Sequence, residues 1–282
     1  MNVGVVLSGG MAKGAYQIGV LKALNDFIPL DNIKFFSCSS VGALNGYAYA
    51  TQKLGVAERM WRELCADQCK LTINQVLRDN MLWKNIVQLC DPPRLNSKFY
   101  CCLFDYSRFN VVYKELSSTN SSLLPLHLCA SVTLPLCKKA VKIGESSYFD
   151  GAIIDNIPVY PLVKHDLYYI ICVHFDDISY QFENDIFDKK TIKIVVPCRS
   201  AIKQSIVLSK ERIDEMIESG YVFAYEILRN VFAKGRENLE HIYRFIGTSD
   251  GRAKKRELRI TGSACLTNIN KFALKLTKRK IV

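Results

Sequence analysis

Short apolar runs alternate along the chain with longer segments whose apolar residues recur at helical spacing. The short runs are rich in β-branched and aromatic residues, which is typical of buried strands. We expect strands at residues 3–8, 33–38, 109–114, 167–174 and 191–197. The helical spacing predicts helices at residues 14–28, 41–53, 56–65 and 210–231. This alternation favours an α/β fold with a largely parallel central sheet and helices on both faces.

The first predicted strand leads into a glycine-containing loop. Gly9, Gly10, Met11, Lys13 and Gly14 lie between that strand and the first predicted helix. Glycine lets backbone N–H groups approach an anion closely, and a helix N-terminus adds a positive dipole end. The loop is therefore a candidate site for a phosphate or a developing oxyanion. A P-loop would need Ser or Thr after its lysine, whereas Lys13 precedes Gly14, and Met11 takes the middle glycine position of a dinucleotide-binding fingerprint.

The second predicted strand ends in a serine pair, and a predicted helix follows directly. Strand, tight turn, nucleophile and helix form the nucleophile elbow, whose consensus is Gly-x-Ser-x-Gly. Ser40 takes the place of the nucleophile, Gly42 is the second glycine, and Cys38 replaces the first. The sharp turn requires small residues at both positions, and cysteine is compact. On this segment alone, a serine that caps the helix is an equal alternative.

A third segment places a carboxylate where it can face a cleft. Asp150 follows two aromatic residues and precedes Gly151 and Ala152. We therefore expect it at a strand end or a turn. Taken alone, an aspartate that merely stabilises the turn is the simpler explanation.

Together, and in this order, the three segments resemble the patatin-like phospholipase family. That family carries a G-G-G-x-[KR]-G loop, a G-x-S-x-G elbow and an Asp-Gly-[GA] motif. The resemblance covers roughly residues 1–230, and includes an Ala-Ser…Pro segment at 130–135 and Asp-Asn-Ile-Pro at 155–158. It departs from the family pattern at Met11 and Cys38, which stand where the family has glycine.

The resemblance implies a single three-layer patatin-like domain at residues 1–233 that hydrolyses carboxylic esters of phospholipids or related lipids. By this resemblance, Ser40 is the nucleophile and Asp150 the base of a Ser–Asp dyad that forms an acyl-enzyme. Backbone N–H groups around Gly9, Gly10 and Met11 would stabilise the oxyanion. No metal or other cofactor is implied. The two departures leave an alternative open, namely a catalytically impaired member that binds lipid or a partner.

The four histidines are the natural rivals to Asp150 as a base. His127, His165 and His174 lie in or beside apolar segments, and His241 lies near the C-terminus. We expect each of them to have a structural role.

Cysteine usage and hydropathy bear on the compartment. The 11 cysteines are an odd number and include no C-x-x-C pair. Because they lie largely in apolar segments, they favour free thiols in a reducing environment. No apolar run approaches the roughly 20 residues of a membrane span, and no cleavable secretory signal is evident. We therefore expect a cytoplasmic protein.

Positive charge is concentrated in residues 234–282, which we call the C-terminal extension. It holds 13 Lys and Arg against 4 Asp and Glu, nine of the net +11 of the whole chain. Ile269, Phe272, Ala273 and Leu276 share one helical face among basic residues. This pattern predicts peripheral contact with an anionic membrane. Packing on the domain and nucleic-acid binding are alternatives, and no nucleic-acid partner is expected because aromatic–basic interleaving on a recognisable module is lacking.

Overall fold

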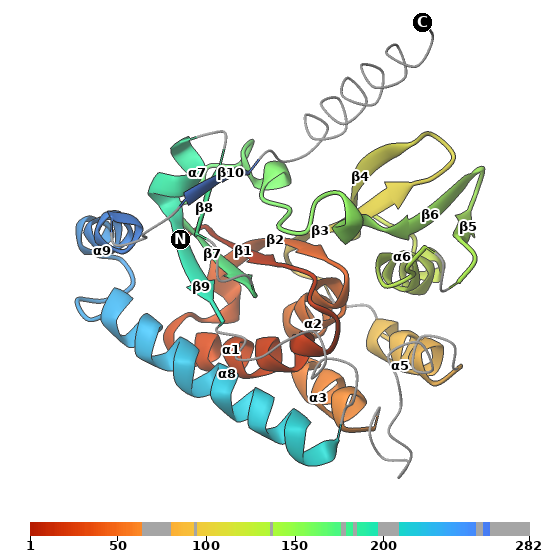
Figure 1. Ribbon diagram of the computed structural model, residues 1–282, viewed down its shortest axis with the longest axis horizontal. Coiled ribbons are helices and arrows are strands. Elements are labelled where there is room, and N and C mark those ends of the chain that lie inside the picture. The colour runs from red at the N-terminus through yellow and green to blue at the C-terminus, as the bar shows by residue number, and fades with distance from the viewer. Residues whose placement is uncertain are drawn as a thin grey trace, which may run out of the picture.

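The computed structural model describes residues 1–63, 80–92, 95–135, 138–175, 179–182, 185–196, 209–251 and 256–259 (Figure 1). The strands are β1 (Val3–Leu7), β2 (Ile33–Ser39), β3 (Lys98–Asp105), β4 (Asn110–Glu115), β5 (Val141–Ile143), β6 (Ser146–Asp150), β7 (Tyr169–His174), β8 (Ser179–Phe182), β9 (Thr191–Val195) and β10 (Arg256–Arg259). The α-helices are α1 (Gly14–Phe27), α2 (Val41–Ala50), α3 (Leu54–Glu63), α5 (Asn80–Cys90), α6 (Leu124–Ser131), α7 (Asp185–Lys190), α8 (Lys210–Val231) and α9 (Leu239–Gly251). The 3-10 helices are η1 (Met11–Lys13), η2 (Leu30–Asn32), η3 (Ser121–Leu123), η4 (Gly151–Ile153) and η5 (Tyr160–Leu162).

The centre of the molecule is an eight-stranded sheet in the order β5-β6-β3-β2-β1-β7-β9, with β4 paired to β3. Strands β3, β2, β1, β7 and β9 run parallel, and β4, β6 and β5 join through antiparallel pairs. Strands β8 and β10 form a separate pair. The mostly parallel sheet with helices around it confirms the predicted α/β class.

Local hydrophobic patterns correctly predicted most of the parallel strands and several of the helices. Every predicted strand and helix is present within three residues of its expected bounds wherever those bounds are described. Strand β3 was not predicted, although it is central to the sheet and almost wholly buried. The antiparallel strands β5 and β6 and the helices α5, α6 and α9 were also not predicted.

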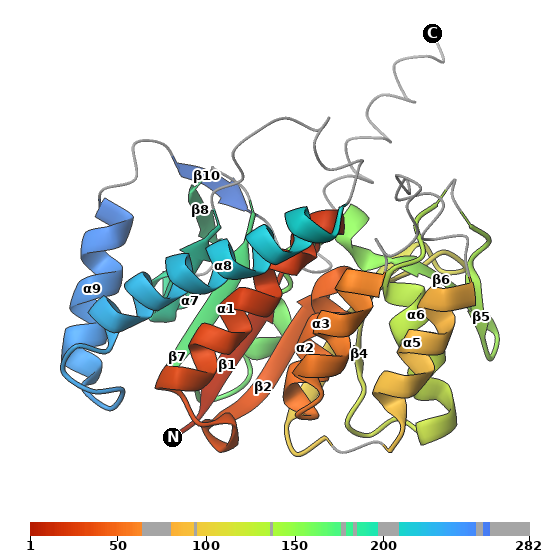
Figure 2. The ribbon, with the colours of Figure 1, turned by 90° about the horizontal axis from the view of Figure 1, so that it is seen from below.

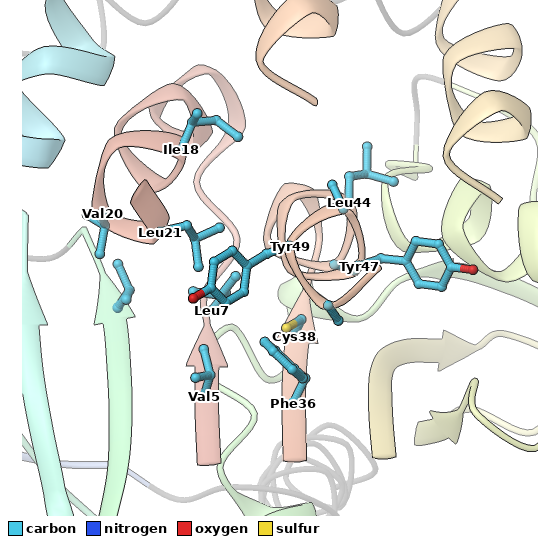
Figure 3. Close-up of a cluster of buried hydrophobic side chains, with 14 of the residues drawn as sticks. Val5, Leu7, Ile18, Val20, Leu21, Phe36, Cys38, Leu44, Tyr47 and Tyr49 are labelled. Carbon is cyan, nitrogen blue, oxygen red and sulfur yellow. The ribbon is translucent and has the colours of Figure 1, made fainter. Parts of the chain in front are cut away.

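The two faces of the sheet bury different side chains because successive strand residues point to opposite sides. Leu7 of β1 and Cys38 of β2 pack against Leu21 of α1 and Leu44 of α2 (Figure 3). Helices α1, α2, α3 and α8 gather on this side of the sheet (Figure 1). On the opposite face, Val6 belongs to a second core to which the segment between β6 and β7 contributes.

Helix α1, which begins at the glycine loop, packs closely on α8. A Cβ atom at Gly19 would collide with the backbone of Ile217, and one at Gly220 would collide with the backbone of Tyr16. The two helix axes therefore approach through a reciprocal pair of glycines. Because of this contact, the long helix α8 holds α1 against the sheet (Figure 2).

Only part of the C-terminal extension is described. Ile242 and Ile246 of α9 are buried in the same core as α1 and α8. The amphipathic stretch at residues 269–280 lies outside the described residues, and the domain boundary after residue 233 stays a prediction. In the described part of the chain, no helix has both the length and the apolar character needed to cross a membrane.

Candidate active site

Strand pairing brings Ser40 and Asp150 to the same place. Strand β2 lies along one edge of β3 as far as Ser39, which pairs with Cys102. The next residue of β3, Leu103, pairs with Asp150 at the end of β6. Strand β4 occupies the other edge of β3, so β6 must continue the line of β2. The residue after β2, Ser40, and the last residue of β6, Asp150, therefore meet nearly end to end.

The backbone at Ser40 has the sharp turn expected of an elbow. Its φ and ψ are 55° and −134°, a conformation that is uncommon and strained for a residue other than glycine. Helix α2 begins at the next residue. A Cβ atom at Gly42 would lie 2.6 Å from the carbonyl oxygens of Leu7 and Ser8. Glycine is needed there because α2 starts directly against the end of β1.

Cys38 fits at the first elbow position because another glycine makes room for its side chain. The Cys38 side chain is fully buried. A Cβ atom at Gly46, one helical turn beyond Gly42, would lie 2.7 Å from the Cys38 Sγ. The thiol therefore fills space that the helix leaves open, and the burial raises the pKa of Cys38 well above its usual value. A buried neutral thiol of this kind is a packing group.

All three sequence motifs converge at Gly9. A Cβ atom there would lie 2.6 Å from Asn156 Oδ1, 2.7 Å from the Cβ of Ser40 and 3.1 Å from the Cβ of Ala152. The Nδ2 of Asn156 also donates to the carbonyl oxygen of Gly9 at 3.4 Å. Asn156 was not singled out from the sequence, although it belongs to the segment at 155–158 that carried part of the resemblance. Its contacts make it an additional residue of this site.

The glycine loop presents backbone N–H groups beside Ser40. Among the described residues, the N–H groups of Gly9, Gly10 and Met11 donate to no backbone acceptor. Met11 has a φ of 52°, and its side chain is 45% exposed. Lys13 forms no ion pair with any of the described residues. Gly14 is the first residue of α1. The arrangement leaves donors available near the serine, as an anion-binding loop requires.

Asp150 combines burial with incomplete hydrogen bonding. Its side chain is 1% exposed, and its Oδ1 accepts a hydrogen bond from the N–H of Ala152 at 2.9 Å. Burial raises the pKa of Asp150 to about 7, although the nearby Ser40 hydroxyl and the Ala152 N–H act in the opposite direction. Its Oδ2 is buried and accepts no hydrogen bond of standard geometry from the described residues. A carboxyl group with this pKa is suited to proton transfer near neutral pH.

Glycine at position 151 lets the chain leave β6 close to β3. A Cβ atom at Gly151 would lie 2.6 Å from the Sγ and the carbonyl carbon of Cys102. Two residues beyond Ile153, the carboxylate of Asp155 accepts a hydrogen bond from Tyr113 at 2.6 Å, and its carbonyl oxygen accepts one from Ser39 at 3.2 Å. These contacts tie the segment after Asp150 to β2 and β4.

A buried polar chain positions the glycine loop. Gln17 Nε2 donates to the carbonyl oxygen of Ser8 at 2.7 Å. Asn45 Nδ2 donates to the carbonyl oxygen of Gly14 at 2.9 Å and to Gln17 Oε1 at 3.0 Å. Trp61 Nε1 donates to Asn45 Oδ1 at 3.0 Å. Sequence reasoning missed Gln17 and Asn45, because a polar residue within an apolar helix does not identify its partner.

Three histidines make contacts that involve neither Ser40 nor Asp150. A ring nitrogen of His127 lies 2.8 Å from the Leu123 carbonyl oxygen, and one of His241 lies 3.1 Å from the Asn230 carbonyl oxygen. His165 stacks on an aromatic ring at 4.0 Å. His174 is buried at the end of β7. Within the described ranges, no group of three or more His, Cys, Asp or Glu side chains is placed to hold a metal ion.

Comparison with known proteins gives a family match and several distant structures. The family model for patatin-like phospholipase matches residues 5–163, a range that contains Ser40 and Asp150. None of the curated proteins compared with the chain matches it.

The structures include VipD from Legionella pneumophila, with 12% identity, a TM-score of 0.48, and coverage of 80% of this chain and 66% of that one. The type III effector protein ExoU has 13% identity, a TM-score of 0.42, and coverage of 80% and 52%. The heterodimeric ExoU–SpcU complex from the type III secretion system of Pseudomonas aeruginosa has 17% identity, a TM-score of 0.37, and coverage of 81% and 51%. Our chain therefore spans between about half and two thirds of their length.

Proposed function

The chain belongs to the patatin-like phospholipase family, and on that premise we propose that it is a serine-dependent lipid acyl hydrolase. Its substrates would be carboxylic esters of phospholipids or related lipids. The observation that carries this proposal is the meeting of Ser40, at a strained turn, with Asp150, a buried carboxyl group of pKa about 7.

The first step would use Asp150 as a general base. A serine hydroxyl is a weak nucleophile until a base takes its proton during attack. Asp150 accepts the Ser40 proton while Ser40 Oγ forms a bond to the acyl carbonyl carbon. The raised pKa supports this role, because an ordinary aspartate, with a pKa of about 3.9, would be a poor base.

The negative charge of the tetrahedral intermediate would be stabilised by the glycine loop. The N–H groups of Gly9, Gly10 and Met11 are available for this purpose, and η1 and α1 begin directly after them. Lys13 adds positive potential. Loss of one such donor typically costs about 10²–10³ in rate.

Three further proton transfers through Asp150 would complete the cycle. When the intermediate collapses, the alkoxide leaves with the proton held by Asp150, and the acyl group stays on Ser40 as an ester. A water molecule then gives a proton to Asp150 as its oxygen attacks this acyl-enzyme. When the second intermediate collapses, the bond between Ser40 Oγ and the acyl carbon breaks and the carboxylic acid leaves. Asp150 returns its proton to Ser40 Oγ, which restores both the hydroxyl and the carboxylate.

The test is hydrolysis of a short-chain soluble ester by single and double variants. Ser40→Ala and Asp150→Asn should each nearly abolish turnover, and the double variant should be little worse, because residues acting as one unit are non-additive. Ser39→Ala is the matched control, since the neighbouring hydroxyl bonds the Asp155 carbonyl oxygen, and it should keep most activity.

Other outcomes would point elsewhere. A folded histidine-to-alanine variant that lost as much activity would replace the dyad with a Ser–His arrangement. Wild-type protein that bound lipid without turnover would favour the catalytically impaired alternative.

We also propose that the C-terminal extension brings the protein to anionic membranes from the cytoplasm. The support is its excess of nine positive charges. Basic segments are attracted to anionic lipid surfaces by about 1 kcal/mol per Lys or Arg near the surface.

A further inference from the structure

The hairpin between β3 and β4 exposes two aromatic rings at its tip. Tyr106 is 59% exposed and Phe109 is 55% exposed. Phe109 also has a φ of 51°, which is uncommon for a bulky residue and marks a strained backbone. An exposed aromatic pair on a strained turn gains little from the fold itself, so it invites a functional explanation.

The tip is held rigidly, so the exposure is a fixed property of the fold. The Tyr106 N–H donates to the carbonyl oxygen of Ser147 at 2.8 Å, and the Ser147 N–H donates to the Ser107 hydroxyl at 2.9 Å. The Arg108 N–H donates to a carboxylate oxygen of Asp105 at 3.1 Å.

Aromatic contacts brace the same hairpin. The Tyr106 ring packs edge-on against Phe149 at 5.7 Å, and the Phe109 ring packs edge-on against Phe104 at 5.3 Å. One side of each exposed ring is thus supported, and the other side faces outward.

This tip lies at the same edge of the sheet as the candidate active site. Strand β3 runs parallel to β2 and continues for three residues past Cys102, the partner of Ser39. The hairpin therefore projects beyond the end of β2, where Ser40 follows.

Two further exposed apolar side chains belong to loops at that edge. Met11 follows β1 and is 45% exposed, and Ile153 follows β6 and is 46% exposed. We call Met11, Tyr106, Phe109 and Ile153 the apolar rim.

Basic groups flank the rim. The Arg108 side chain is 68% exposed and contacts the Ser146 hydroxyl at 3.2 Å. Exposed Lys142 lies on the edge strand β5 opposite Ser147, the residue that binds the Tyr106 backbone. Lys13 lies two residues beyond Met11. The acidic residues beside them are Asp105, which is buried and paired with Arg108, and exposed Glu145.

We propose that the apolar rim is a membrane-docking surface that seats the active-site edge on the lipid–water interface. Apolar and aromatic side chains partition into the boundary between headgroups and acyl chains, and the flanking cations complement lipid phosphates. The inference rests on the proposed function, and it makes the bilayer itself the source of the ester. It is separate from the C-terminal extension, since the rim acts chiefly through apolar contact.

The test is binding of the full chain to vesicles of phosphatidylcholine and phosphatidylserine, measured by co-sedimentation in high salt. The double variant Y106S/F109S should bind about tenfold more weakly or worse, because a buried aromatic side chain contributes roughly that much or more to transfer from water. Its hydrolysis of a soluble short-chain ester should be unchanged. Y106W/F109W should bind at least as well as wild type, since tryptophan favours the interface.

The matched control removes exposed apolar groups elsewhere. Val222 of α8 is 51% exposed, and Tyr168, beside the start of β7, is 45% exposed. Y168S/V222S should bind vesicles as wild type does. Thermal unfolding of every variant checks that the fold is intact.

The outcomes separate the two proposals. If Y106S/F109S binds vesicles as tightly as wild type, or if wild type does not bind, the docking proposal is wrong, while ester turnover still supports the proposed function. If Y106S/F109S keeps wild-type binding to vesicles but loses binding to a partner protein that wild type binds, the rim is a protein-binding surface instead. If binding depends on the rim but no ester is hydrolysed, the docking surface stands and the proposed function fails.

Discussion

Among single residues, Asp150 has the environment that matters most for the proposed chemistry. The carboxyl group is almost completely buried, and one of its oxygens has no hydrogen-bond partner of standard geometry in the described chain. Burial therefore outweighs the opposite effects of the nearby Ser40 hydroxyl and the Ala152 N–H, and the pKa rises to about 7. The balance favours the neutral acid below that pH.

Ester turnover should follow the ionisation of Asp150. We expect kcat/KM to rise with pH through about 7 and to level off above it, because only the carboxylate can accept the Ser40 proton. The measurement is kcat/KM for a soluble ester across this range. A profile that stays flat down to pH values near the ordinary aspartate pKa of about 3.9 would contradict the assignment.

The same ionisation links stability to pH. The folded-state pKa of about 7 exceeds the unfolded value, so the stability contribution of the protonated group is complete at low pH. It is lost as the pH rises from about 4 toward 7. Asp150→Asn removes this titration, and its melting temperature relative to wild type should therefore increase across that interval.

Replacing Met11 and Cys38, the two departures from the family pattern, by glycine should change the stability of the protein in opposite directions. Met11 has a φ of 52°, so Met11→Gly relieves strain of about 1–3 kcal/mol at an entropic cost of about 0.5–1 kcal/mol. We expect its melting temperature to rise by roughly 2–4 °C. Cys38→Gly removes a buried group that fills the space at Gly46, and should lower stability by about 1–2 kcal/mol.

Thermal unfolding and ester turnover of both glycine variants check these signs. Turnover should change little in Cys38→Gly, because the thiol faces the core. A fall in the melting temperature of Met11→Gly would show that Met11 is not strained. An inactive wild type that gained activity with both glycines would show that these substitutions had disabled the enzyme.

At the scale of elements, the site depends on how the beginnings of α1 and α2 are joined. The Gln17 side chain donates a hydrogen bond to the carbonyl oxygen of Ser8, and the Asn45 side chain donates one to that of Gly14. Trp61 of α3 completes the chain of hydrogen bonds. A rigid connection between helices therefore sets the position of the loop that carries the proposed oxyanion donors.

Breaking this connection should cost both stability and activity. Asn45→Leu keeps a similar volume but leaves the Trp61 N–H and the Gln17 amide without their partner in a buried place. We expect a loss of about 2–4 kcal/mol in the free energy of unfolding, since each orphaned group costs about 1–3 kcal/mol. The turnover number for a soluble ester should fall as well.

The control for this prediction is Asn230→Leu. Its side-chain amide bonds the Glu226 carbonyl oxygen on an exposed helix surface, and such substitutions usually stay within about 0.5 kcal/mol. Equal stability of the two leucine variants in urea unfolding would show that the buried chain of hydrogen bonds contributes little.

For the whole molecule, the uneven charge predicts a separable membrane-binding segment. Deleting residues 267–282, which contain five Lys and Arg, should weaken binding to anionic vesicles more than it affects hydrolysis of a soluble ester. The effect should fade with salt, because the Debye length falls from ~10 Å at 0.1 M to ~3 Å at 1 M. Vesicle binding that is insensitive to both truncation and salt would make this segment structural.

The sequence by itself determined the features that depend on near neighbours. Hydrophobic periodicity located the parallel strands β1, β2, β7 and β9 and the helices α1, α2, α3 and α8, because a buried strand or helix face imposes its period on a short window. It also identified the turn at Ser40 and the glycine loop at residues 9–14. Their roles in catalysis stay a prediction from resemblance and chemistry.

Only the tertiary structure decided which of these segments pair and pack with one another. Strand β3 was not predicted, although it is as continuously apolar as β1 and β7. Its pairing with both β2 and β6 brings Asp150 to Ser40. The raised pKa of Asp150 and the space for Cys38 at Gly46 likewise depend on residues far apart in the chain. Burial and pairing are properties of the packed whole, and no local pattern encodes which distant segment supplies the partner.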